Sequence, residues 1–215
     1  MGKYDYEYKW DSRYCYTGTF ILKNKLDIRN KEDLEKLERE ITTLAIAEIR
    51  VNPVRGKFDF AHLCSIHRAI FRDIYDWAGK IRSVNIMKGN PFCMCNVIHG
   101  YAADLFSKLK ADNFLIGRNL DDIRGGLAYY LSEINVLHPF REGNGRTQRV
   151  FIEYLAKNAG YNVDFSAVES SEMIEASVLA FDKNYSAMMV MLSRIISPIT
   201  QKNKKTLYNR SAKGR

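Results

Sequence analysis

Twelve consecutive residues, from His138 to Arg149, bring together the groups that a phosphate-transfer site needs. They read His-Pro-Phe-Arg-Glu-Gly-Asn-Gly-Arg-Thr-Gln-Arg, and Pro139 interrupts the apolar helical pattern that precedes them. A new helix is predicted to begin inside the stretch, so free backbone N–H groups and the positive end of a helix dipole would face outward there. Gly143 and Gly145 would let a phosphate approach this backbone without a Cβ in the way.

The charged side chains of the same stretch suit a nucleotide triphosphate. Arg146 and Arg149 are three residues apart and fall on one face of the first helical turn, where two guanidinium groups suit a polyphosphate. Glu142 can hold the Mg²⁺ that such a ligand brings, and His138, with an ordinary pKa of about 6.5, is a suitable general base for a hydroxyl. Each of these features alone is more often structural; together they favour chemistry.

Apolar residues recur every three or four positions along most of the chain, which predicts helices around this stretch. Asn30 is a suitable N-cap for the first helix, Gly79 is expected to end the second, and Gly160 to follow the fifth. The predicted helices span residues 31–50, 59–77, 99–112, 120–137, 144–159, 167–180 and 183–196.

A single stretch carries a convincing sheet signal. The Gly89-Asn90-Pro91 turn lies between two short β-capable segments, which predicts a β-hairpin of residues 81–87 and 92–97. The fold class expected is therefore all-α with one hairpin.

Composition limits the class of protein. The chain has 215 residues, 46% hydrophobic, and the longest apolar run is too short for a membrane span of about 20 residues. The N-terminus lacks the apolar region of a signal peptide. We expect an aromatic arm over residues 1–24, one domain over 25–200 and a basic, disordered tail over 201–215.

The basic charge of the chain is concentrated at its end. The net charge is +8, but residues 201–215 hold six Lys and Arg and no acid, so the rest is nearly neutral. The tail is read as a solubilising segment or, less favoured, as a docking arm for an acidic partner or nucleic acid. The four cysteines form no zinc-type spacing, and reduced thiols of a cytoplasmic protein are expected. His62 and His67 are expected to be surface or core histidines.

The stretch 138–149 resembles the signature of the Fic family, H-P-F-x-[D/E]-G-N-G-R-x-x-R, and every fixed position matches. Residues 73–82 resemble the segment that leads to the Fic flap, the hairpin after them resembles the flap itself, and the run 17–25 resembles an early Fic segment. The organisation is most similar to class I FicT toxins. This resemblance implies a compact bundle of about seven to eight helices with one β-hairpin flap.

The resemblance implies a protein adenylyltransferase, which transfers AMP from ATP to a Ser, Thr or Tyr hydroxyl of a target protein and releases pyrophosphate. The substrate would be ATP and the metal Mg²⁺, and the flap would align an extended segment of the target. Within the signature, His138 would be the base, Phe140 would fix the loop and Glu142 would bind Mg²⁺. The anion hole would be formed by Gly143, Asn144 and Gly145, and the β- and γ-phosphates would be held by Arg146 and Arg149. The flap would contain Lys88, Gly89 and Phe92, with Phe92 as its clamp.

Gly145 favours AMP over phosphate as the transferred group. In the related Doc branch a Lys stands here and the nucleotide binds reversed. Transfer of UMP, phosphocholine or another phosphate-containing group also occurs in the family and stays an alternative.

Regulation is expected to come from a second protein. Many Fic proteins carry an inhibitory helix, S/T-x-x-x-E-G/N, whose Glu pairs with the second signature arginine. The one partial match is Ser171 to Glu175, but Ala176 follows it. The resemblance therefore implies a small helical antitoxin that supplies this motif to Arg149.

The target is an expectation of the resemblance alone. For FicT-type toxins it would be the ATPase subunits of DNA gyrase and topoisomerase IV, with no membrane and no specific nucleic acid involved. Two other readings stay open: a host-directed effector that modifies GTPases, and a non-enzymatic nucleotide or nucleic-acid binder that uses the tail.

Overall fold

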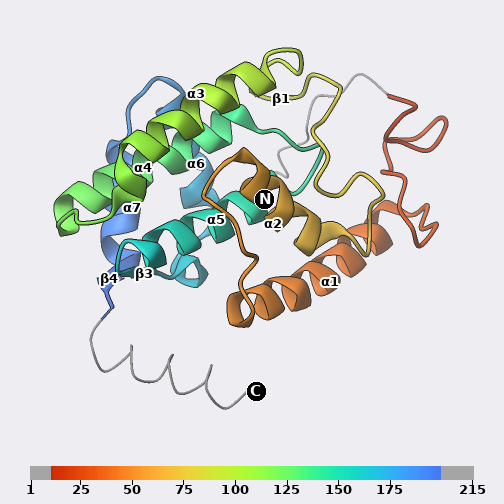
Figure 1. Ribbon diagram of the computed structural model, residues 1–215. Helices are drawn as coiled ribbons and strands as arrows, with labels where there is room; N and C mark the ends of the chain where they lie inside the picture. Colours follow the sequence, from red (N-terminus) through yellow and green to blue (C-terminus); the bar gives the residue numbers. More distant parts are fainter. Residues whose placement is uncertain (1–10, 200–215) are drawn as a thin grey trace. The chain divides into compact units, whose positions relative to one another are not determined.

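The computed structural model describes residues 11–199, so the expectations for residues 1–10 and for the tail 201–215 lie outside the described residues. The described chain forms two compact units, one of residues 11–110 with 133–151 and one of residues 111–132 with 152–199. Figure 1 shows their helices coloured along the sequence. The site-bearing stretch 138–149 belongs entirely to the first unit.

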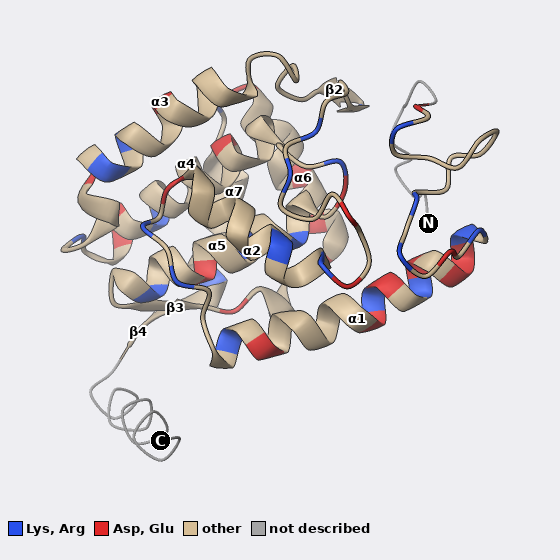
Figure 2. Cartoon of the chain, turned by 45° about the vertical axis from the view of Figure 1, so that its right-hand side comes forward, with Lys and Arg blue, Asp and Glu red and all other residues tan. Residues whose placement is uncertain are grey.

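The first unit is built on a long charged helix and an apolar one. Helix α1 (Lys31–Val51) begins after Asn30, whose side chain accepts a hydrogen bond from the Asp33 N–H at 3.0 Å, so the predicted N-cap is confirmed. Figure 2, coloured by residue type, shows acidic and basic residues following one another along α1. Helix α2 (Phe60–Phe71) packs against α1 and presents six buried side chains. Helix α3 (Ile98–Ala111) lies close to its predicted bounds.

Helix α2 is shorter than predicted, because the expected extension to Trp77 and Gly79 does not form. Two hydrogen bonds from Lys25 explain the early end: its backbone N–H donates to the Ile74 carbonyl and its Nζ to the Arg72 carbonyl. These tertiary bonds use carbonyls that a longer helix would have needed. Ile74 and Trp77 keep their helical spacing in the sequence but lie in turns.

The hairpin is also shorter than predicted. Only β1 (Met87–Lys88) and β2 (Asn90–Pro91) pair, antiparallel, instead of residues 81–87 with 92–97. Pro91 has no N–H to donate, and Gly89 occupies the turn with φ +70°. The flanking backbone groups bond elsewhere, as described below.

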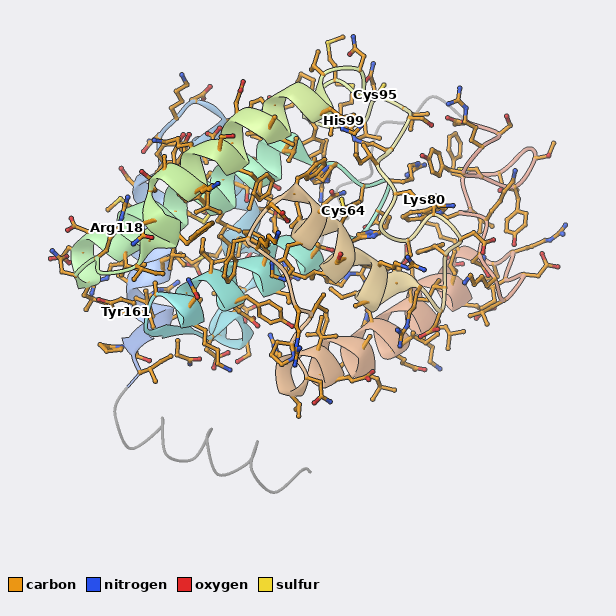
Figure 3. All side chains as sticks on the ribbon, in the orientation of Figure 1. Cys64, Lys80, Cys95, His99, Arg118 and Tyr161 are labelled. Atoms are coloured by element: carbon orange, nitrogen blue, oxygen red, sulfur yellow. The ribbon has the colours of Figure 1, made fainter. Side chains whose placement is uncertain are left out.

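The C-terminal part of the second unit consists of two helices and a short pair of strands. Helices α6 (Ser170–Phe181) and α7 (Ser186–Ile195) pack together, each starting later than predicted. Strands β3 (Tyr161–Val163) and β4 (Ile196–Pro198) form an antiparallel pair that the sequence reasoning missed, because three-residue strands leave no readable alternation. The Tyr161 hydroxyl donates to the Arg118 carbonyl at 2.8 Å; both residues are labelled in Figure 3.

Two helices supply segments to both units. Helix α4 (Leu120–Leu137) has the predicted bounds, and α5 (Asn144–Asn158) begins at the predicted residue. With them the described residues hold seven α-helices, and two single-turn 3-10 helices complete the elements at Asn113–Leu115 and Phe165–Ala167. The all-α class with a short hairpin is therefore confirmed. Among residues 11–199, no helix has the length and apolar character required to cross a membrane.

Candidate active site

The chemistry-bearing stretch forms a loop between two helices. Helix α4 ends at Leu137, and α5 begins at Asn144. The Asn144 side chain closes the loop on itself: its Oδ1 accepts from the Phe140 N–H at 2.9 Å, and its Nδ2 donates to the Phe140 carbonyl at 2.8 Å. Because both ends of this amide are used inside the loop, Asn144 fixes the shape of the loop that precedes α5.

Gly143 occupies a position that no other residue can take easily. Its φ is +81°, and a Cβ built on it would lie 2.2 Å from the Phe71 ring. Its carbonyl accepts from the N–H and the hydroxyl of Thr147 at 3.1 and 2.9 Å, which starts α5. The glycine thus permits close packing of the loop against α2.

Gly145 faces open space beneath a guanidinium group. A Cβ built there would meet one neighbouring atom outside its own helix backbone, Arg149 Nη1 at 3.4 Å. Arg149 therefore folds back over the first turn of α5. A cationic fork above an uncovered helix start is an arrangement that suits an anionic phosphate.

His138 is held in an uncommon backbone conformation at the end of α4. Its φ is +41° although it is not glycine, and its N–H donates to the Ile134 carbonyl at 3.1 Å. Nδ1 lies 3.1 Å from the Asn135 carbonyl. A carbonyl can only accept, so Nδ1 carries the proton and Nε2 is the nitrogen that can accept one.

The environment keeps His138 neutral. Burial, together with the nearby positive charges of Arg82 and Lys88, lowers the pKa of His138 to about 3. The ring is 5% exposed, and the Phe92 ring stacks on it with centroids 3.6 Å apart. The flap residue expected to clamp a target thus lies on the imidazole itself. A phosphate bound at α5 would raise this pKa, because negative charge favours the protonated form.

Phe140 and a second histidine brace the loop from behind. Phe140 is 1% exposed and stacks on the ring of His67 at 3.8 Å. His67 Nδ1 accepts from the Gly79 N–H at 2.8 Å, so its Nε2–H donates to the Glu142 carbonyl at 3.0 Å. Burial lowers the pKa of His67 to about 3, which keeps this tether neutral. Of the two predicted alternatives, surface or core, His67 is a core histidine, and its link to the loop had no local sequence signal.

The two signature arginines have different neighbours. Arg146 bonds to α1, with Nη2 2.5 Å from Glu38 Oε1 and Nη1 3.0 Å from Thr42 Oγ1, and its guanidinium lies over the Phe71 ring at 4.8 Å. Glu38 also accepts from the Tyr75 hydroxyl. Nη1 of Arg149 lies 3.4 Å from a Cβ built on Gly145. Sequence reasoning missed Glu38 and Thr42, because α1 is a charged helix one hundred residues upstream.

Glu142 is the carboxylate nearest to the start of α5. Its Oε1 accepts from the Gly143 N–H at 2.9 Å and lies 3.8 Å from Arg146 Nη2. Burial and the Glu38 carboxylate raise the pKa of Glu142, while Arg146 opposes them. One carboxylate beside a phosphate site fits Mg²⁺, which takes one or two carboxylates plus phosphate oxygens. The described residues hold no cluster of three His, Cys, Asp or Glu side chains for a metal.

The other predicted flap residues lie near the edge of the site. Lys88 and Gly89 form the tip of the hairpin, and the positive charge of Lys88 acts on His138. Cys95 follows the hairpin, and His99 lies in the first turn of α3, where Figure 3 labels both. All four cysteines are free thiols.

A neutral imidazole, an uncovered helix start and an overlying guanidinium define the class of an enzyme that handles nucleotide phosphates. The Fic/DOC family model matches residues 57–156 of the chain. A relative from Escherichia coli (strain K12), named probable protein adenylyltransferase Fic, is 38% identical over 186 residues; the match covers 86% of this chain and 92% of the relative. The chain belongs to the Fic/DOC family.

Two further likenesses extend this result. Protein adenylyltransferase VbhT of Bartonella schoenbuchensis is 37% identical over 188 residues, which cover 87% of this chain but 39% of that longer protein. The crystal structure of BepC, a VirB-translocated effector of Bartonella tribocorum with bound AMPPNP, matches with a TM-score of 0.82 at 28% identity, covering 86% of this chain and 97% of that one. The chain is an enzyme of the protein adenylyltransferase class.

Proposed function

We propose that this protein transfers AMP from ATP to a Ser, Thr or Tyr hydroxyl of a target protein. The observation that carries the proposal is the open first turn of α5: Gly145 leaves space beneath Arg149, and His138 lies at the other end of the same short loop. The relative solved with AMPPNP supports ATP as the nucleotide.

The reaction follows from the geometry of the loop. Nε2 of His138 takes the proton of the acceptor hydroxyl, because Nδ1 is already protonated toward the Asn135 carbonyl. The hydroxyl oxygen attacks the α-phosphorus, the bond from that phosphorus to the bridging oxygen breaks, and pyrophosphate leaves. The amides of Asn144 and Gly145 at the start of α5 would face the phosphates, while the Gly143 N–H is bonded to Glu142, and Arg149 would hold the leaving portion.

Glu142 is the residue that would hold Mg²⁺ in this reaction. When bound, the ion neutralises charge on the phosphates of the nucleotide. The chain itself fixes the direction of that carboxylate through the Gly143 N–H and the His67 bond to the Glu142 carbonyl. Arg146, bonded to Glu38 and Thr42, braces the same side chain and leaves phosphate contact mainly to Arg149.

The transferred group is tested with two labels. We expect label from α-labelled ATP, and none from γ-labelled ATP, to appear on a protein acceptor in bacterial lysate. The variant His138→Ala should transfer neither label, whereas His99→Ala, an exposed histidine of α3, should behave as wild type. Label from the γ-position would instead show phosphate transfer, and label from neither with a folded wild type would refute the proposal.

We further propose that the protein is a bacterial, cytoplasmic toxin held inactive by a small helical antitoxin. The relative from E. coli, 92% of which is matched, supports a bacterial setting for the enzyme. The antitoxin would bring the Glu of an S/T-x-x-x-E-G/N motif to Arg149; in the chain itself the partial match ends in Ala176, and Glu175 is exposed on α6. Expression with and without a co-expressed antitoxin gene tests this, and growth arrest only without it is expected.

The ATPase subunits of DNA gyrase and topoisomerase IV are the proposed targets. Supercoiling and decatenation assays after incubation with ATP should show loss of both activities, along with α-label on the ATPase subunits. Unlabelled subunits in a reaction that modifies another lysate protein would contradict this target.

An effector role is the second candidate. It is favoured by the similarity to BepC, a translocated effector whose solved chain is matched over 97% of its length. Labelling of purified small GTPases, in parallel with the topoisomerase subunits, separates the two roles.

A further inference from the structure

Arg82 is the largest fully buried side chain among the described residues and lies beside the proposed site, yet the proposed reaction gives it no role. It is 2% exposed, and the hydrogen bonds of its guanidinium go to three backbone carbonyls. A buried charge is tolerated only when its donors are satisfied, so these three bonds specify where each carbonyl must lie.

The first carbonyl belongs to the proposed catalytic base. Arg82 Nε donates to the His138 carbonyl at 2.8 Å, and the Arg82 backbone N–H donates to the Pro139 carbonyl at 2.9 Å. Two bonds from one residue thus hold both peptide groups that follow the imidazole.

These peptide groups need such support. His138 has φ +41°, a region that side chains other than glycine rarely adopt, and the proline that follows restricts it further. A strained residue keeps its conformation only where surrounding bonds over-determine it. Without Arg82, the loop could relax and turn the imidazole away from the start of α5.

The other two carbonyls belong to the two sides of the flap. Arg82 Nη1 donates to the Val84 carbonyl at 2.6 Å, and Nη2 donates to the Cys93 carbonyl. Val84 precedes β1 and Cys93 follows β2, so one guanidinium gathers both sides of the hairpin. The strands themselves pair over two residues each, which is too little to fix the flap.

We propose that Arg82 is a positioning residue. Its guanidinium holds the strained His138 loop and the flap in a fixed position relative to each other. The acceptor segment and the base would then meet only when both are held by this guanidinium. The inference rests on the proposed function for its kinetic consequence, but the structural link between loop and flap stands apart from which group is transferred.

A positioning role predicts that removal of the Arg82 donors affects turnover but not nucleotide binding. Arg82→Met keeps the apolar stem and removes all three side-chain donors. Turnover of AMP transfer should fall about 100-fold, as expected for a misplaced base. Nucleotide affinity should stay at the wild-type value, because the guanidinium of Arg82 bonds to carbonyls of the loop and the flap and not to α5. A role limited to overall stability would instead lower both together.

The experiment compares Arg82→Met and Arg82→Lys with Arg124→Met, a partly buried arginine of α4 paired with Asp121. It measures turnover, AMPPNP affinity and amide hydrogen exchange. In Arg82→Met the Phe92 and Cys93 amides, bonded to Ile86 and Val136, should exchange faster while α2 amides do not change. Arg82→Lys, which keeps the charge but cannot reach three divergent carbonyls, should be intermediate.

Two results would overturn the proposal: wild-type turnover with wild-type flap exchange in folded Arg82→Met, or faster exchange throughout α2 with loss of AMPPNP binding. If Arg82→Met does not fold, Arg82→Lys decides by the same criteria. If wild type transfers no AMP, the proposed function fails, and the exchange measurement still tests the link between loop and flap.

Discussion

The loop 138–143 and the flap 84–93 meet at His138, but they are held in place by different numbers of bonds. The loop has local bonds, between His138 and Asn135 and between Asn144 and Phe140, and it also receives bonds from the distant residues His67 and Arg82. The flap pairs over two residues on each strand and otherwise depends on Arg82 and on the Val136 carbonyl of α4. The difference teaches that the reacting groups lie on an element fixed by many bonds, whereas the proposed docking edge is fixed by few.

The largest effect is expected at the loop. His138→Ala should reduce AMP transfer by about 10²–10⁴-fold, the contribution of a positioned base, because it removes the Nε2 that takes the hydroxyl proton. Thermal unfolding monitored by circular dichroism should show that the variant folds. Near-normal transfer by this variant would show that the base lies elsewhere, and the loop would then not be the element that carries the reacting group.

Substitution of one glycine in the loop and one in the flap compares how tightly the two regions are packed. Gly143→Ala should destabilise the protein by about 3 kcal/mol, because strain at φ +81° adds to overpacking against Phe71. Gly89→Ala should cost about 1–2 kcal/mol, because it has φ +70° but nothing within 4 Å of the added Cβ. Urea unfolding measures both. Equal losses would show that the loop is no more tightly packed than the flap.

The two signature arginines sharpen the account of the loop. Arg146→Ala should cost about 2 kcal/mol of stability, because Glu38 and Thr42 lose a charged partner. Arg149→Ala should reduce AMP transfer about 10²-fold, the effect of losing a phosphate donor. Urea unfolding and labelling assays on both variants check this. The reverse pattern would mean that Arg146 is the main phosphate ligand.

The buried histidines predict a pH dependence of stability. The pKa values of His67 and His138 are about 3 in the folded protein against 6.5 as the ordinary value. The unfolded chain therefore binds more protons between pH 3 and 6.5. The free energy of unfolding is therefore at its full value above pH 6.5. Below that pH it falls by about 1.4 kcal/mol per pH unit for each histidine.

Unfolding free energies between pH 5 and 6.5 test this dependence, with His67→Gln as the comparison. The slope should be smaller in the variant, which lacks one of the two titrating rings. Identical slopes would show that His67 is not held neutral in the folded state. Titration of Glu142, whose raised pKa acts in the opposite direction, is common to both proteins and cancels in the difference.

The smallest effect is expected at the tip of the flap. Lys88→Ala should change stability by less than about 0.5 kcal/mol, since the side chain lies on a two-residue strand at the surface edge. The KM for the protein target should rise, while the KM for ATP stays the same. A change in ATP affinity alone would show that the flap acts on the nucleotide and not on the acceptor.

The sequence predicted the parts of the fold that depend on local patterns. Helix α4 has the predicted bounds, and α5 begins at the residue that the two flanking glycines indicate. Where tertiary bonds compete, the pattern was wrong: Lys25 takes the carbonyls that would have extended α2, and Arg82 takes those that would have lengthened the hairpin.

The same limit applies to the candidate site. All signature side chains could be named from their spacing, because they lie within twelve residues. Glu38, His67 and Arg82 could not, since each reaches the loop from a distant helix or turn and resembles an ordinary charged or core residue in the sequence. Their identification needed the spatial contacts.

A structure of the protein with AMPPNP and Mg²⁺ tests the central claim most directly. The account predicts the α-phosphate between the first amides of α5 and Nε2 of His138, with the γ-phosphate beneath Arg149. A reversed nucleotide that presents its γ-phosphate to His138, or a nucleotide bound away from Gly145, would contradict it.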